Sequence, residues 1–193
     1  MNNRSLPYCM IAFNSLKEFG KYWHIPEWKR PLSKIVYDNV FHSTNLHTGF
    51  ITRGSLNKRI EYEKNPKFDK KTGKKKPFQP CFDHYLSPQF VGRMIMDNPS
   101  AYLEDFDVFK NIFTLMTSVV ETTNPENTKL RQLTSNKGGD YKVFASTDTK
   151  YEVAEIELLK RPKGETSWIK ATITDDKLYF PKDLIEYEKR FLV

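Results

Sequence analysis

Apolar residues recur at helical spacing in the first fifty positions of the chain. One such stripe consists of Leu16, Phe19, Tyr22 and Trp23. It predicts a helix with Ser15 as its N-cap and Pro26 as its closing residue. A second apolar stripe predicts another helix between Pro31 and Phe41. Residues 1–52 are therefore predicted to form an N-terminal helical segment rich in aromatic residues.

The middle of the chain changes repeatedly between strand-like and helix-like patterns. The aromatic stretch 78–86 and the β-branched stretch 117–123 each favour a strand. Between them a helix is predicted over residues 102–115, because apolar residues follow at three- and four-residue spacing: Phe106, Phe109, Phe113 and Met116. A further helix is predicted to begin at Asn124-Pro125, with Asn as N-cap and Pro at the first helical position.

The pair Gly138-Gly139 marks a predicted boundary. Beyond it, strands are predicted at 141–144, 151–159 and 167–173, followed by a closing helix over 182–191. The predicted fold class is α+β. The predicted division of the chain is 1–52 (helical), 53–137 (a basic loop and then two strands and a helix) and 138–193 (strand-rich, ending in a helix).

Positive charge is concentrated just before the strand at 78–86. The chain has 31 Lys and Arg against 24 Asp and Glu, a net charge of +7. Between residues 53 and 76, ten basic residues accompany only Glu61, Glu63 and Asp69, so this segment alone carries as large an excess. A solvated, disordered loop is one interpretation. Its position next to the strand favours the other, a hairpin or loop that grips phosphate groups.

Several classes of protein are not supported. No apolar run approaches the ~20 residues of a membrane span, and the first residues lack the apolar core of a signal peptide. The two cysteines, Cys9 and Cys81, are far apart and outside any Cys-x-x-Cys spacing, which argues against a disulfide framework and a Cys-ligated zinc site. We expect a cytoplasmic protein without a membrane partner.

The dipeptide Asp83-His84 is the main candidate for chemistry. It stands near the end of the strand at 78–86, directly before the break at Ser87-Pro88. Neighbouring residues on a regular strand face opposite sides. If the chain leaves the sheet at this point, the carboxylate is able to reach a metal ion while the imidazole reaches a water molecule.

After the second predicted strand begins, residues 119–127 read Val-Val-Glu-Thr-Thr-Asn-Pro-Glu-Asn. Together with Asp83-His84, this order resembles the ββα-metal core of HNH nucleases, in the subgroup typical of phage homing endonucleases. That family has Asp-His at the end of its first strand, a Val/Thr-rich second strand, and Glu-Asn on the helix. The family's Trp on the second strand is absent here, and Thr117 or Ser118 stands where the family has Asn.

The resemblance implies an α+β fold with a ββα-metal (HNH-like) core within 53–137. It implies that His84 is the general base that takes a proton from the attacking water. It also implies that Asp83 and Asn127 bind one divalent metal ion. Such an oxygen-rich site suits Mg²⁺, with Mn²⁺ as the alternative ion.

The function implied is that of an HNH-type endonuclease, a phosphodiester hydrolase that cuts double-stranded DNA. Its source would be a phage or mobile element, and it would act in the host cytoplasm. Residues 138–193 would then be a DNA-recognition unit. The expected DNA contacts are Arg53, Lys58, Arg59, Lys70, Lys71, Lys74, Lys75, Lys76, Arg93 and Arg131. The alternative is a non-catalytic, basic nucleic-acid-binding protein in which Asp83-His84 is only structural.

Overall fold

The computed structural model describes residues 4–84, 86–133 and 147–172, and it combines helices with one sheet. The helical elements are α1 (Leu6–Phe19), the 3-10 turn η1 (Gly20–Tyr22), α2 (Pro26–His42), α3 (Arg53–Lys64), α4 (Pro88–Asp97), α5 (Pro99–Leu103), α6 (Phe106–Thr117), α7 (Asn124–Leu133) and α8 (Thr147–Val153). The strands are β1 (Leu46–Thr52), β2 (Cys81–His84), β3 (Ser118–Thr122), β4 (Leu158–Lys160) and β5 (Ile169–Lys170). The predicted α+β class is confirmed.

The described strands form one sheet in the order β2-β3-β1-β4-β5. β1 and β3 run parallel, and the other neighbouring strands run antiparallel. A parallel pair needs a long crossover, and here the chain between β1 and β3 contains α3, β2 and the helices α4 to α6. Strands from all three predicted segments, 1–52, 53–137 and 138–193, contribute to this sheet.

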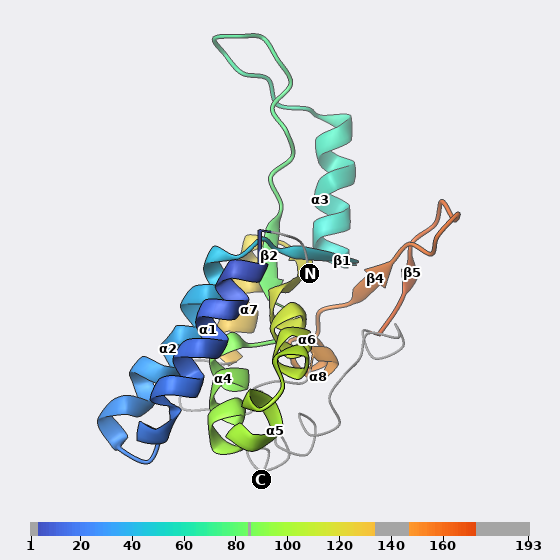
Figure 1. Cartoon of the computed structure of the whole chain (residues 1–193). Coiled ribbons are helices and arrows are strands. Elements are labelled where there is room, and N and C mark those ends of the chain that lie inside the picture. Colours follow the sequence, from blue (N-terminus) through green and yellow to red (C-terminus); the bar gives the residue numbers. More distant parts are fainter. Residues whose placement is uncertain (1–3, 85, 134–146, 173–193) are drawn as a thin grey trace.

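Helices α1, α2, α4, α5 and α6 gather into a helical layer (Figure 1). The residues between them are apolar and buried, among them Leu16, Leu32, Val36, Ile95, Phe109 and Phe113. Val120 of β3 belongs to the same apolar core and attaches the helical layer to the sheet. Because burial of apolar surface is the main favourable term in folding, this core determines where β2 and β3 lie.

Helix α3 and the chain after it project away from the rest of the molecule (Figure 1). We call residues 53–80 the basic arm. Its first helix is capped by Thr52, whose Oγ1 accepts a hydrogen bond from the backbone N–H of Ser55 at 3.1 Å. Glu121 of β3 then accepts hydrogen bonds from Ser55 Oγ at 2.8 Å and from Arg59 Nε at 2.6 Å. The arm therefore starts from a well-anchored point on the sheet.

One carboxylate joins the N-termini of α3 and α7. Glu126 Oε2 accepts hydrogen bonds from Thr52 Oγ1 at 2.7 Å, from Thr123 Oγ1 at 2.8 Å and from the Thr123 backbone N–H at 2.9 Å. Thr123 Oγ1 also lies 3.3 Å from the backbone N of Glu126, so the two residues form a capping box. A negative charge is favourable here because two helix dipoles point at it. The N-cap of α7 is thus Thr123, one residue before the predicted Asn124.

The N-terminal helices differ from the prediction in their boundaries. α1 begins at Leu6, so Ser15 lies inside the helix and does not cap it. Pro26 is the first residue of α2 and does not end the preceding helix. Backbone N–H groups in the first turn of a helix have no partner within the helix, so a proline, which lacks this group, is favourable there. Pro31, predicted to be the start of the second helix, lies inside α2.

Two further differences follow from side-chain capping and from periodicity. The helix predicted over 102–115 is divided into α5 and α6, since the Asp105 carboxylate accepts a hydrogen bond from the Asp107 N–H at 2.7 Å and starts a new helix. The strand predicted over 151–159 is wrong in its first half, where α8 continues to Val153 and buries Tyr151. The strand predicted at 141–144 and the helix predicted at 182–191 lie outside the described residues.

Gly54→Ala tests the joint at Glu126. A Cβ on Gly54 would overlap the Glu126 carboxylate, so we expect this variant to disturb the hydrogen bonds of Glu126 and to lower the free energy of unfolding by about 1–3 kcal/mol. The measurement is urea unfolding followed by circular dichroism. Gly92→Ala is the comparison variant, because that Cβ would meet the Val36 side chain at 3.3 Å and needs a shift of only a few tenths of an ångström, whereas a Cβ on Gly54 would overlap Glu126 Oε1. If both variants lose the same free energy of unfolding, the hydrogen bonds of Glu126 do not have the importance assigned to them.

Candidate active site and nucleic-acid interface

The strands and helix that carry the candidate residues form one unit. β2 and β3 pair antiparallel, with Cys81 opposite Thr122 and Asp83 opposite Val120. α7 follows β3 and packs against β2. Its contact with the strand includes a hydrogen bond from Asn127 Nδ2 to Cys81 Sγ at 3.1 Å. Asn127 is thereby brought next to the strand that carries Asp83, although the two residues are far apart in the sequence.

Asp83 is held by two residues of α8. Its Oδ2 accepts hydrogen bonds from Lys150 Nζ at 2.5 Å and from Tyr151 OH at 2.6 Å. The Lys150 ammonium also donates to the backbone carbonyl of His84 at 2.6 Å. Both charged side chains are largely buried, with 9% of Lys150 and 14% of Asp83 exposed. Both hydrogen bonds to the carboxylate end on Oδ2, so Oδ1 takes part in neither.

His84 is held in a defined protonation state. Its Nδ1 lies 3.1 Å from the backbone carbonyl of Met116, and a carbonyl only accepts hydrogen bonds, so Nδ1 carries the proton. Burial lowers the pKa of the imidazole below 6.5, with the Lys150 ammonium acting in the same direction and the Asp83 carboxylate opposing it. The side chain is therefore a neutral imidazole at neutral pH, with its basic lone pair on Nε2.

The register of β2 determines which candidates come together. Cys81 and Asp83 are two residues apart and share one face of the strand, the face that Asn127 contacts. His84 pairs with Val119 and is still part of the regular ladder, so the alternation turns its side chain to the opposite face. The structure thus brings Asn127 to the side of the strand that carries Asp83, and it does not bring the imidazole of His84 to them.

Thr122 adds an oxygen to the face of Asn127 and Asp83. It is 1% exposed and lies opposite Cys81. Within the described part of the chain, its Oγ1 is buried and has no hydrogen-bond partner. A buried polar atom without a partner is costly, which marks this face as a place where a further group would be favourable.

Sequence reasoning missed Lys150 and Tyr151. The sequence places both in or beside a predicted strand, and no local signal relates them to Asp83. Their pairing depends on α8 packing near α7 and β2. A lysine about seventy residues after a carboxylate has no spacing rule that would identify it as a partner.

The arginines of the basic arm are engaged by the body of the protein. Arg53 Nε lies 2.8 Å from Glu157 Oε2, and this hydrogen bond lowers the pKa of Glu157. Arg59 pairs with Glu121 and lies over the ring of Phe78. Their positive charges are thus neutralised locally by carboxylates, and the exposed charge of the arm comes from its lysines.

The lysines predicted to contact DNA lie along the arm and at its end, and all are exposed: Lys58, Lys70, Lys71, Lys74, Lys75 and Lys76. Arg131 is exposed on α7, the helix that also carries Asn127. Arg93 is exposed on α4, in the helical layer and away from the arm. The structure therefore groups the lysines together and separates Arg93 from them.

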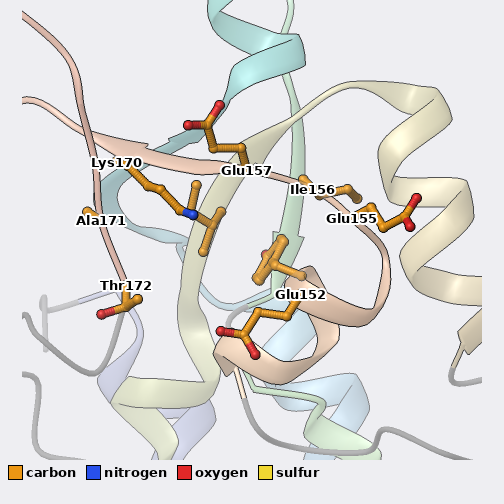
Figure 2. A pocket seen from close by; sticks show the side chains of 9 residues that line it. Glu152, Glu155, Ile156, Glu157, Lys170, Ala171 and Thr172 are labelled. Carbon is orange, nitrogen blue, oxygen red and sulfur yellow. The ribbon is translucent and has the colours of Figure 1, made fainter.

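A cavity of about 330 Å³ lies between α8, β4 and the end of β5 (Figure 2). Its acidic lining residues are Glu152, Glu155 and Glu157, and Lys170 also lines it. Carboxylates repel phosphate groups, so this cavity is not a suitable surface for a nucleic acid. Glu157 is in addition already paired with Arg53.

Asn127→Ala tests the contact between α7 and β2. Cys81 is partly exposed and its Sγ lies 3.1 Å from Asn127 Nδ2. Removing the Asn127 side chain uncovers the sulfur, so the rate of Cys81 alkylation is expected to increase several-fold. Iodoacetamide labelling followed by mass spectrometry measures this rate. Cys9 is an internal control, because it is fully buried and burial raises its pKa to about 12. An unchanged Cys81 rate in the variant would contradict the contact.

His84 is expected to make the stability of the protein depend on pH. Its pKa in the folded state is below the ordinary value of 6.5, so the unfolded chain binds more protons as the pH falls through this value. Stability is therefore lost below about pH 6.5. Urea unfolding at pH 7.5 and 5.5 should show a larger loss for the wild type than for His84→Gln. The same loss in both proteins would show that His84 is not the group responsible.

Comparison of the chain with protein-family models, with curated proteins and with solved structures gave no match. In the described ranges, no helix is both long and apolar enough to cross a bilayer. The function is therefore argued from the site and its chemistry.

Proposed function

We propose that this chain is a metal-dependent DNA endonuclease with a ββα-metal type of core, as its resemblance to HNH nucleases implies. The observation that carries the proposal is the arrangement of β2, β3 and α7. Two antiparallel strands followed by a helix bring Asn127 to within 3.1 Å of Cys81, on the same strand as Asp83. The residues that the resemblance assigns to the metal thus lie on one side of β2.

The donors on this face fit a hard divalent cation. They are the Asp83 carboxylate, the Asn127 amide and the buried Thr122 hydroxyl, which has no other partner in the described residues. Oxygen donors of this kind suit Mg²⁺ or Mn²⁺. No cluster of three His, Cys, Asp or Glu side chains occurs in the described ranges, so the neutral oxygens of Asn127 and Thr122 are needed. A bound ion would stabilise the charge that develops on the phosphate.

His84 has the electronic properties of a general base. Its Nδ1 proton is directed at the Met116 carbonyl, and its low pKa keeps Nε2 free to accept a proton at neutral pH. Catalysis by His84 requires that the end of β2 turn, so that Nε2 reaches the water near Asp83. His84 still pairs with Val119, its carbonyl accepts a hydrogen bond from Lys150, and its Nδ1 lies 3.1 Å from the Met116 carbonyl. The turn therefore has to break these contacts.

Lys150 adds a feature that the resemblance does not include. Its ammonium neutralises Asp83 from one side through Oδ2. It therefore competes with a metal ion for the charge of this carboxylate. We expect metal affinity to be modest for this reason.

A second candidate function is nucleic-acid binding without catalysis. It is favoured by the same ion pair, because Lys150 and Tyr151 together give Asp83 a purely structural role. This candidate predicts that DNA binds to the basic arm and is never cut.

Plasmid nicking decides between the two functions. With Mg²⁺ or Mn²⁺ the wild type is expected to nick plasmid DNA, and EDTA should abolish this activity. His84→Ala should reduce nicking about 100-fold or more, the usual contribution of a general base. Asn127→Ala should also reduce nicking, because it removes a proposed ligand of the metal ion. Both variants should retain DNA binding in EDTA. Asp83 is not substituted, because removing one partner of a buried ion pair destabilises the fold.

Thr128→Ala is the matched control for Asn127→Ala, since Thr128 is the next residue on α7 and is exposed. It should leave nicking unchanged. If His84→Ala nicks like the wild type, the assignment of His84 is wrong. If the wild type binds DNA but does not nick it with either ion, the second candidate function replaces the first.

A further inference from the structure

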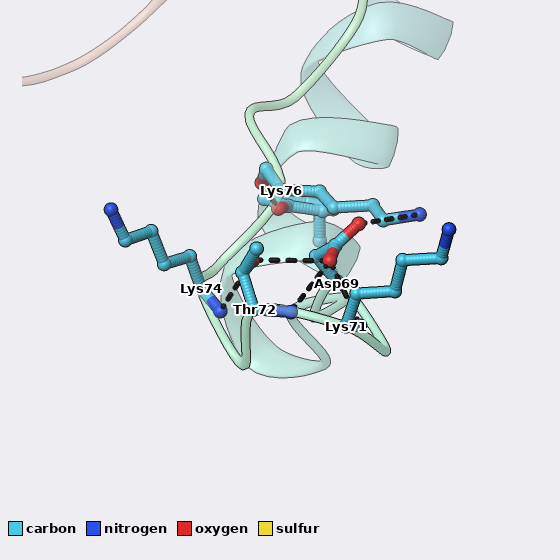
Figure 3. A network of polar contacts seen from close by, with 6 residues as sticks. Asp69, Lys71, Thr72, Lys74 and Lys76 are labelled. Atoms are coloured by element: carbon cyan, nitrogen blue, oxygen red, sulfur yellow. Dashed lines mark hydrogen bonds and ion pairs between the residues drawn. The ribbon is translucent and has the colours of Figure 1, made fainter.

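The end of the basic arm is a folded element. We call residues 67–76 the arm tip. Asp69 Oδ1 accepts hydrogen bonds from the backbone N–H groups of Lys71 at 3.0 Å and Thr72 at 2.8 Å, and from Thr72 Oγ1 at 3.0 Å (Figure 3). Gly73 takes a φ of +64°, which a glycine adopts without strain. Asp69 is thus the centre around which the turn is built.

Backbone hydrogen bonds close the tip behind Asp69. The Asp69 N–H donates to the Lys74 carbonyl at 2.8 Å, and the Lys76 N–H donates to the Lys67 carbonyl at 2.8 Å. Phe68 and Lys75 form an antiparallel bridge between these bonds. The hydrogen bonds to its carboxylate lower the pKa of Asp69, so it stays ionised at neutral pH. The lysines of the tip therefore project from a defined turn and not from a structureless loop.

Phe68 is exposed in the middle of these lysines. The residue is 57% exposed, and it lines a hollow of about 500 Å³ together with Asp69 and four lysines, Lys67, Lys70, Lys71 and Lys76. Lys76 lies 3.9 Å from Asp69 Oδ2. An exposed phenyl ring loses its contact with water only if a partner covers it. A partner that covers the ring and contacts the lysines would offer a flat apolar surface next to negative charge.

A nucleic acid with an accessible base has both properties. Its phosphates suit lysine ammonium groups, which act as point charges and read no sequence. The face of any base stacks on an aromatic side chain. A fully paired duplex offers the phosphates but keeps the faces of its bases covered by stacking. The phenyl ring would therefore bind DNA with unpaired bases more tightly than fully paired DNA.

We propose that the arm tip is a preformed contact for DNA, in which its lysines hold the phosphates and Phe68 stacks on an unpaired base. The proposal rests on the proposed function only in taking DNA as the partner. Asp69 is a positioning residue in this contact, since it shapes the turn and touches no DNA.

Asp69 allows a test in which electrostatics and structure predict opposite results. Asp69→Ala removes a negative charge from a basic surface, so charge alone would increase affinity for DNA. Loss of the turn would instead scatter the lysines and weaken binding. Glu63→Ala is the matched control. Glu63 is an exposed acid on α3 in the same arm, so its substitution by Ala removes the same negative charge. We expect Asp69→Ala to bind at least threefold more weakly than Glu63→Ala.

The ring is tested with two DNA probes of equal length and charge, one fully paired and one with a stretch of unpaired bases. Fluorescence anisotropy in EDTA measures affinity without cleavage. Phe68→Ala is expected to weaken binding of the unpaired probe about tenfold and of the paired probe less than twofold. Phe41→Ala is the control, because Phe41 is 63% exposed on α2, outside the arm; it should change neither affinity.

Each outcome has one meaning. If Asp69→Ala binds as tightly as Glu63→Ala, the preformed turn is not needed and the proposal is overturned. If Phe68→Ala affects both probes equally or neither, stacking on a base is excluded. Binding to phosphatidylserine-containing vesicles without binding to DNA would also overturn the proposal and would point to a membrane surface. Because the assay contains no metal ion, a protein that binds DNA as expected but never nicks it refutes only the proposed catalysis.

Discussion

The carboxylate of Glu126 is the constraint on which both functional parts of this protein depend. It accepts hydrogen bonds from the residues that cap α3 and α7, so the first helix of the basic arm and the helix of Asn127 begin at the same partly buried point. Two helix N-termini favour this negative charge, and Gly54 leaves the space that it occupies. A shift of this carboxylate would therefore move the basic arm and the candidate metal ligand together.

Charge is distributed by the fold in a way that the net value of +7 does not show. At the base of the arm, Glu121 and Glu157 neutralise Arg59 and Arg53. Inside the protein, Lys150 neutralises Asp83. The exposed charge that remains on the arm belongs mainly to lysines. Buried pairs are held in fixed geometry, whereas exposed lysines keep their hydration and their freedom to reach phosphates.

The strongest sequence predictions concern local structure. The β-branched run at 117–123 and the aromatic run at 78–86 contain β3 and β2, and the helix predicted after Asn124 is α7. These predictions were successful because strand and cap preferences act within a few residues. Predictions failed where one pattern was compatible with two structures. Tyr151 starts a run that alternates like a strand, but packing of α8 near α7 decides in favour of a helix.

The sequence by itself determined the α+β class, the concentration of positive charge between residues 53 and 76, and the residue types of the candidate site. The prediction of a hairpin or loop for 53–76 was wrong over its first half, where α3 forms. The sequence also determined that Asp83 and His84 are neighbours, because that is a covalent fact. Only the tertiary structure decided that Asn127 lies against Cys81, that Lys150 and Tyr151 hold Asp83, and that the ladder continues through His84 and turns its imidazole to the other face. The physical reason is that propensities and periodicities act over a few residues. Contacts between residues more than forty positions apart depend instead on which apolar surfaces pack together and on the strand register that this packing selects.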